Sequence, residues 1–103
     1  MGRQIIWSEF AKAQLRDIFD YHTRVASERV ALRLVGKIAA CIEILHDNPD
    51  AGRREDLLAD YPQQFRYLVE GNYKILYYSD AATITISSVF DCRQNPVNIH
   101  LQK

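Results

Sequence analysis

The stretch FRYLVEGNYKILYY, residues 65–78, decides the fold and raises the first question about function. Apolar and aromatic residues dominate on both sides of a central Gly-Asn pair, a pattern that predicts two strands joined by a tight turn. Two cations, Arg66 and Lys74, lie inside these strands. They belong either to an ordinary solvated face of the sheet or to a surface that binds a partner or a substrate. The register of the hairpin distinguishes these two possibilities.

Loop length sets that register, because successive side chains point to opposite faces of a strand. A two-residue turn at positions 71–72 pairs Arg66 with Tyr77 and Glu70 with Tyr73. Each face of the hairpin then carries a mixture of charged and apolar residues.

A three-residue loop over positions 70–72 instead makes one face wholly apolar or aromatic. That face comprises Phe65, Tyr67, Val69, Tyr73, Ile75 and Tyr77, extended on a following strand by Ile84, Ile86 and Phe90. We favour this register, because burying Glu70 or Arg66 without a partner would cost several kcal/mol.

The favoured register gathers the two cations on the opposite face of the sheet, which we expect to stay open. The residues expected there are Arg66, Leu68, Lys74, Leu76, Tyr78 and Val89, with Arg93 within reach after the last strand. An open face with three large apolar residues is typical of a partner or substrate surface, and a solvated amphipathic face is the alternative.

Two helices are predicted before the hairpin. Ser8 and Ser27 are good N-caps, and each is followed by a glutamate in the first turn. Apolar residues recur at helical spacing near 8–24 and 28–46. Because few residues separate these segments, we expect an antiparallel helical hairpin, preceded by a short strand over 3–7.

The remaining elements give the fold class. Residues 47–63 read as a helical turn or an irregular crossing, and strands are expected at 64–69, 73–78 and 83–90. The sequence therefore predicts an α+β fold in one domain over residues 1–103. Its short N-terminal strand and helical hairpin would pack on a C-terminal antiparallel sheet of three to four strands.

Composition narrows the classes of function. The net charge of zero argues against a generic polyphosphate binder. The sequence has no apolar run of the ~20 residues that span a bilayer and no apolar core of a signal peptide, so we expect a cytoplasmic protein without membrane contact. The spacing of Cys41, Cys92 and the three histidines predicts neither a disulfide nor a metal site. No cofactor is expected.

Four short segments in order resemble the RelE/ParE superfamily of bacterial toxins from type II toxin–antitoxin systems, over nearly the whole chain. WSEFAKAQLRDIFDYH (7–22) is similar to the family's opening helix, and ILHDNPDAGRRE (44–55) to its loop after the second helix. FRYLVEGNYKILYY is similar to the family's hairpin, and ITISSVFDCRQNP (84–96) to its last strand and end. The resemblance implies a helical hairpin packed on a twisted antiparallel sheet.

The RelE-like branch implies an enzyme that cuts mRNA on the ribosome without a metal. Carried over by position, Arg66 and Lys74 match two basic strand positions, and Arg93 falls near a third. Tyr78 would supply the acid or stacking residue, since no tyrosine lies near the C-terminus. Leu68 occupies a place where nucleolytic members often have another cation, so the catalytic set is incomplete.

The ParE-like branch implies inhibition of DNA gyrase by protein contact, without catalysis. This sequence looks more like that branch, because of its long helical pair, neutral charge, incomplete cation set and Gly-Arg-Arg loop at 52–54. Asp91 departs from the family pattern, since many relatives carry His before the final Arg.

The resemblance also implies an antitoxin whose flexible segment wraps the toxin. Candidate partner-binding residues are Arg53, Leu68, Leu76, Val89 and Arg93. For the two arginines the alternative role is a salt bridge, with Asp91 or Glu55 as the expected partner. The favoured function is a gyrase-directed toxin neutralised by its antitoxin. The alternatives are a ribosome-dependent endoribonuclease and a non-toxic family member that only binds antitoxin.

Overall fold

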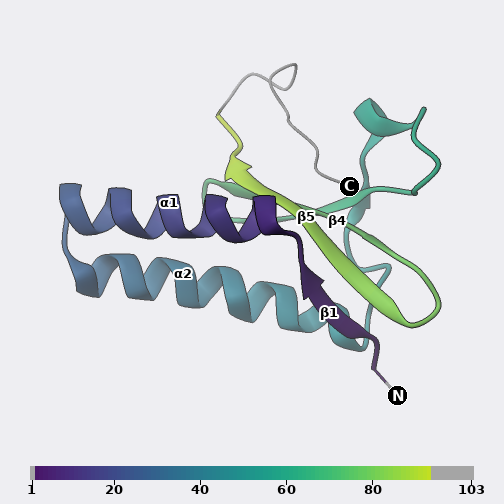
Figure 1. The fold of residues 1–103 in the computed structure, drawn as a ribbon, viewed down its shortest axis with the longest axis horizontal. Helices are drawn as coiled ribbons and strands as arrows, with labels where there is room; N and C mark the ends of the chain where they lie inside the picture. Colours follow the sequence, from purple (N-terminus) through teal and green to yellow (C-terminus); the bar gives the residue numbers. More distant parts are fainter. Residues whose placement is uncertain (1, 94–103) are drawn as a thin grey trace.

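Two helices cover one face of a five-stranded sheet in the computed structural model, which describes residues 2–93 (Figure 1). The α+β architecture predicted from the sequence is confirmed. The elements in chain order are β1 (Gln4–Trp7), α1 (Glu9–Val25), α2 (Glu28–Glu43), η1 (Ile44–His46), β2 (Arg53–Arg54), η2 (Asp56–Leu58), β3 (Arg66–Glu70), β4 (Tyr73–Ser79) and β5 (Thr83–Asp91), where η marks a 3₁₀ turn.

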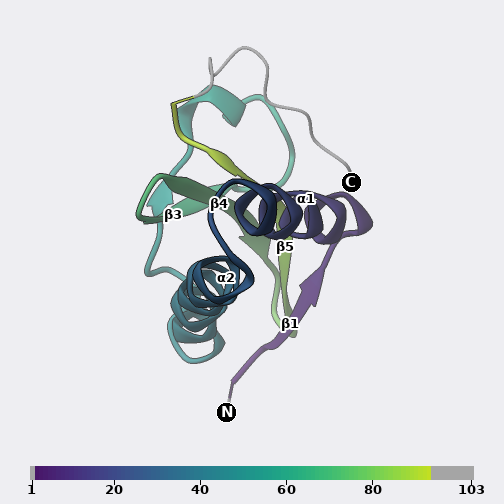
Figure 2. The same ribbon diagram turned by 90° about the vertical axis from the view of Figure 1, so that its left-hand side faces the viewer.

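Serine caps start both helices where the sequence predicts them. The Ser8 hydroxyl accepts a hydrogen bond from the Ala11 amide at 3.0 Å, and that of Ser27 accepts one from the Val30 amide at 3.1 Å. The α-helical part of α2 ends at Glu43, before the predicted end, because the chain tightens into η1. The closed end of the hairpin projects beyond the sheet in Figure 1, and Figure 2 shows both helices from that end.

The sheet has the strand order β1-β5-β4-β3-β2. It differs from the predicted antiparallel sheet at both edges. β1 pairs in parallel with β5, and the two-residue β2 pairs with β3 at the opposite edge. A parallel pair needs a long crossover, which the helical hairpin supplies on the way from β1 to the other strands.

The predicted register of the β3–β4 hairpin is wrong. Glu70 pairs with Tyr73 and Arg66 with Tyr77, so Gly71 and Asn72 alone form the turn. Gly71 has a φ of 59°, the positive value that a two-residue hairpin turn requires. Neither charged residue is fully buried in this register, because Arg66 and Glu70 lie at strand ends and stay partly exposed.

A bulge in β5 brings side chains from both parts of the strand onto the inner face of the sheet, the face that the helices cover. Leu76 pairs with Ser88 and Tyr77 with Ile86, so β5 has one extra residue, Ser87, at this point. On α1, the Gln14 side chain accepts hydrogen bonds from the Val89 amide at 2.7 Å and the Ser88 hydroxyl at 3.0 Å. The inner core cluster comprises Ala11, Ile38, Ile42, Leu45, Tyr73, Ile75, Tyr77, Ile84, Ile86 and Val89.

The outer face of the sheet is partly covered by the chain around η2. Leu58, Phe65 and Leu76 form a second buried cluster there, with Tyr67 and Tyr78 packed against it. The prediction that Phe65, Tyr67, Val69 and Phe90 face the helices is therefore wrong: the pairing puts all four on the outer face. Leu76 has no exposed surface, so the expected open apolar face does not form as predicted.

Candidate functional site

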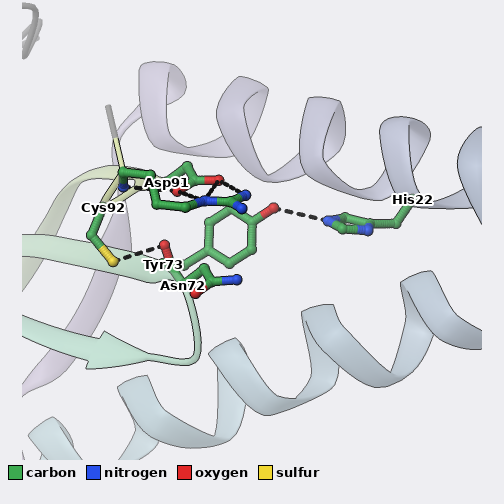
Figure 3. A network of polar contacts seen from close by, with 6 residues as sticks. His22, Asn72, Tyr73, Asp91 and Cys92 are labelled. Carbon is green, nitrogen blue, oxygen red and sulfur yellow. Dashed lines mark hydrogen bonds and ion pairs between the residues drawn. The ribbon is translucent and has the colours of Figure 1, made fainter. Parts of the chain in front are cut away.

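A polar network closes the gap between the helical hairpin and the end of the sheet (Figure 3). His22 on α1 reaches across to Tyr73 on β4, with 2.9 Å between the imidazole Nε2 and the phenol oxygen. Tyr73 pairs with Asp91 on the neighbouring strand. The Arg93 guanidinium donates hydrogen bonds to both carboxylate oxygens of Asp91. Its Nε lies 2.9 Å from Oδ1 and 3.1 Å from Oδ2, and its Nη2 lies 2.5 Å from Oδ2.

The hairpin turn anchors the other side of this network. The Asn72 carbonyl accepts a hydrogen bond from the Cys92 amide at 2.7 Å and one from its thiol at 2.9 Å. Figure 3 shows Asn72, Tyr73, Asp91 and Cys92 gathered at the sheet end, with His22 facing them from the helix. These bonds hold the turn against the residue that follows β5.

Charges in the network stabilise one another. The hydrogen bond from the Arg93 side chain lowers the pKa of the Asp91 carboxyl, against a smaller opposing effect of burial. The same contact raises the pKa of Arg93. Burial raises the pKa of the Tyr73 phenol, with a further contribution from the Asp91 charge. Asp91 and Arg93 are therefore both charged at neutral pH, and Tyr73 is a neutral hydrogen-bonding group.

Two hollows flank this network. The first, called here the α2 hollow, has a volume of about 280 Å³ and lies between α2 and the β3–β4 turn. The second, the α1 hollow, has a volume of about 340 Å³ and lies between α1 and the end of β5. His22, Tyr73 and Arg93 line both. The α2 hollow combines apolar side chains with the cations of Arg33 and Lys37, a mixture suited to binding a protein segment.

The catalytic candidates are not brought together. Arg66 shares the inner face with Tyr77, whereas Lys74 pairs with Val69 on the outer face. Arg66 donates a hydrogen bond to the Gly52 carbonyl at 2.8 Å and lies 3.6 Å from the Asp50 carboxylate. The predicted placement of Arg66 and Lys74 on one face is wrong, because the two-residue turn shifts one strand by a residue relative to the other.

Lys74 is enclosed on the outer face. It forms an ion pair with the buried Glu55, and its ammonium lies 4.1 Å from the centre of the Tyr67 ring. Tyr78 shares this face and stacks edge-on against Phe65, with 5.3 Å between ring centres. Both side chains contact neighbouring residues of the fold rather than lining one of the hollows at the hairpin end.

The apolar partner-binding candidates do not form an exposed patch. Val89 belongs to the inner core and Leu68 packs against it, while Leu76 is buried in the outer cluster. Arg53 and Arg93 are exposed, on β2 and after β5. The alternative role is confirmed for Arg93, which pairs with Asp91. Arg53 has no ion pair with another residue between positions 2 and 93.

Sequence reasoning missed the residues that make the hairpin-end site. Tyr73 is predicted on an apolar face and does belong to the inner core, but no pattern in the sequence indicates its contact with His22. Neither Arg33 nor Lys37 is among the site residues predicted from the sequence. No local pattern marks these residues, because α1, α2 and the β3–β4 turn that supply them come together only in the folded chain.

Within the described part of the chain, no three His, Cys, Asp or Glu side chains are placed to share a metal ion. None of the helices there has the length and apolar character needed to cross a bilayer.

Comparisons with known proteins agree with this architecture. Residues 5–96 match the family model described as the ParE toxin of the type II toxin-antitoxin system, parDE. A solved structure described as the chromosomal ParDE TA system from P. aeruginosa superposes with a TM-score of 0.71 at 19% sequence identity, covering 86% of this chain and 95% of that one. A search of curated proteins found no match.

The structural likeness, at this low identity, supports the fold alone. The family match is stronger evidence, because it extends over most of the sequence, from β1 to beyond β5. The chain therefore belongs to the ParE toxin family of type II toxin–antitoxin systems.

Proposed function

We propose that this protein is a toxin that arrests growth by binding DNA gyrase, and that a cognate antitoxin neutralises it. Family membership supports the toxin role and an antitoxin partner. The choice of gyrase over the ribosome rests on one observation: Arg66 and Lys74 lie on opposite faces of the hairpin, each engaged with an acidic residue.

Metal-free RNA cleavage needs a base, an acid and a charge stabiliser around one scissile phosphate. Arg66 and Lys74 cannot contact one phosphate from opposite sides of a sheet. Lys74 would also have to leave Glu55, its partner in a largely buried ion pair. Inhibition by contact requires no such cluster and is compatible with the surface at the hairpin end.

The experiment is induced expression in a bacterial host, followed by two separate assays. We expect growth arrest with gyrase-dependent DNA breaks and intact mRNA on the ribosome. Growth arrest with ribosome-associated mRNA cleavage and no breaks would instead support an endoribonuclease. Normal growth with neither effect, despite antitoxin binding, would support a non-toxic family member.

A double variant, Arg66→Ala plus Lys74→Ala, tests the same choice through the residues. We expect it to keep its toxicity in proportion to the amount of folded protein in the cell. Loss of toxicity from an equally abundant, folded variant would contradict the gyrase proposal.

A further inference from the structure

We infer that the α2 hollow receives a partner segment carrying a carboxylate flanked by apolar side chains, and that this carboxylate takes Arg93 away from Asp91. The inference rests on the proposed function, because the partner that we assign to the hollow is the antitoxin. Two elements go beyond the proposed function: the chemistry of the bound segment, and the competition between its carboxylate and Asp91 for Arg93.

The lining of the hollow defines the chemistry of its occupant. Val30 and Leu34 present an apolar strip along α2, where Val30 is 37% exposed, while Ile38 beside them is fully buried in the core. Such a strip favours an apolar side chain from a partner, because burying it removes apolar surface from water. Arg33 and Lys37 stand on the same helix beside the strip.

The charges around the hollow are mostly positive and largely uncommitted. Arg33 and Lys37 form no ion pair with any residue between positions 2 and 93. Among the described residues, Arg93 forms an ion pair with Asp91 alone, and its side chain is 74% exposed. Glu70 is the one acidic residue in the described lining. A segment with a carboxylate therefore complements this surface, and a cationic one does not.

In the protein without its partner, the Asp91 carboxylate pairs with Arg93 as the partner's carboxylate would in the complex. It occupies Arg93 through three contacts but does not itself line the α2 hollow. The Arg93 side chain is 74% exposed, so solvent screens its attraction to Asp91 and leaves the guanidinium accessible to a second carboxylate. A partner carboxylate inside the hollow would be flanked by Arg33 and Lys37 as well, so it would compete well for the guanidinium.

Nucleic acid is the less suitable occupant. The apolar strip offers nothing to a phosphate backbone, and Glu70 would repel it. Binding to nucleic acid gains its affinity from many phosphate contacts, whereas this chain has no net charge.

Asp91→Asn provides the sharpest test, because it should strengthen binding. Asparagine keeps an acceptor for the Arg93 amide, which donates to the Asp91 carboxylate at 2.8 Å, but it lacks the negative charge that holds the guanidinium. We expect affinity for the antitoxin to rise by up to about fivefold, which is the upper end of the strength of a solvent-screened ion pair expressed as an equilibrium ratio. The matched control, Asp17→Asn, removes the same charge from the α1 hollow and should leave affinity nearly unchanged.

Removing the cations should weaken binding. We expect Arg93→Gln to lower affinity about tenfold or more, since it removes a charged hydrogen-bond donor from the complex. Arg33→Gln with Lys37→Gln should also lower affinity and reduce its dependence on salt. The control pair, Arg16→Gln with Arg29→Gln, removes equal charge from positions that line neither hollow.

The measurement is isothermal titration of the purified toxin variants with the antitoxin encoded beside the toxin gene, at two salt concentrations. Weaker binding by Asp91→Asn, or equal losses in the test and control pairs, would overturn the inference while leaving toxin neutralisation intact. No complex with the wild-type toxin would overturn the proposed antitoxin partnership, and this inference with it. Tight binding of a DNA duplex that is lost in Arg93→Gln would assign the hollow to nucleic acid instead.

Discussion

Replacing Glu55 with alanine is expected to destabilise the protein by about 3 kcal/mol, because it leaves the Lys74 ammonium buried without its partner. Glu55 is 7% exposed, and the Lys74 side chain is 17% exposed. The Glu55 carboxylate also accepts a hydrogen bond from the Leu57 amide at 3.3 Å, which helps to hold η2 on the outer face. Chemical denaturation followed by circular dichroism measures the change.

Removing both charges at once should recover most of the lost stability. In Glu55→Leu plus Lys74→Met, apolar side chains of similar length replace the pair, an exchange that is often neutral for buried ion pairs. If the protein acts by contact with gyrase, this folded double variant should still arrest growth. A stable double variant that has lost its toxicity would show that Lys74 takes part in the activity.

Substituting Gly52 with alanine is expected to cost about 2–3 kcal/mol through overpacking. A Cβ atom there would lie 2.6 Å from the Tyr67 carbonyl oxygen and 2.7 Å from the Tyr77 phenol oxygen. Neither atom can shift without a cost in free energy, because the first belongs to the backbone and the second is held by hydrogen bonds. The Gly52 amide donates to the Tyr77 oxygen at 2.9 Å, and that hydroxyl donates to the Pro49 carbonyl at 2.8 Å. We expect a lower midpoint of chemical denaturation.

Gly36→Ala is the matched control for this change. Gly36 lies on the exposed side of α2, where an added Cβ meets no atom within 4 Å. Alanine in a helix interior should stabilise the protein by about 0.5–1 kcal/mol relative to glycine. Similar effects from the two substitutions would contradict the close packing assigned to the loop at Gly52.

Local signals in the sequence predicted the helices well. Ser8 and Ser27 cap them as expected, since capping depends on residues within one turn of the chain. The pairing of β1 with β5 depends on residues nearly eighty positions apart, and no local pattern reports it. The hairpin register failed for a different reason. Two loop lengths were chemically reasonable, and charged residues near strand ends can reach solvent in either one.

The candidate site was harder to predict because it depends on that register. A register that puts Arg66 and Lys74 on one face predicts a catalytic cluster, whereas the observed register separates them. The network that the structure contains joins His22 to Tyr73, and Asp91 to Arg93, across three elements. Only the Asp91–Arg93 pair could be expected from the sequence, because its two members are close along the chain.

The most direct test of inhibition by contact adds the purified protein to DNA gyrase and relaxed plasmid, with a parallel reaction on mRNA-programmed ribosomes. We expect supercoiling to fall and cleaved DNA linked to gyrase to accumulate, while the mRNA stays intact. Full supercoiling activity at a molar excess of the protein, together with mRNA cleavage that Lys74→Met abolishes, would contradict the proposal.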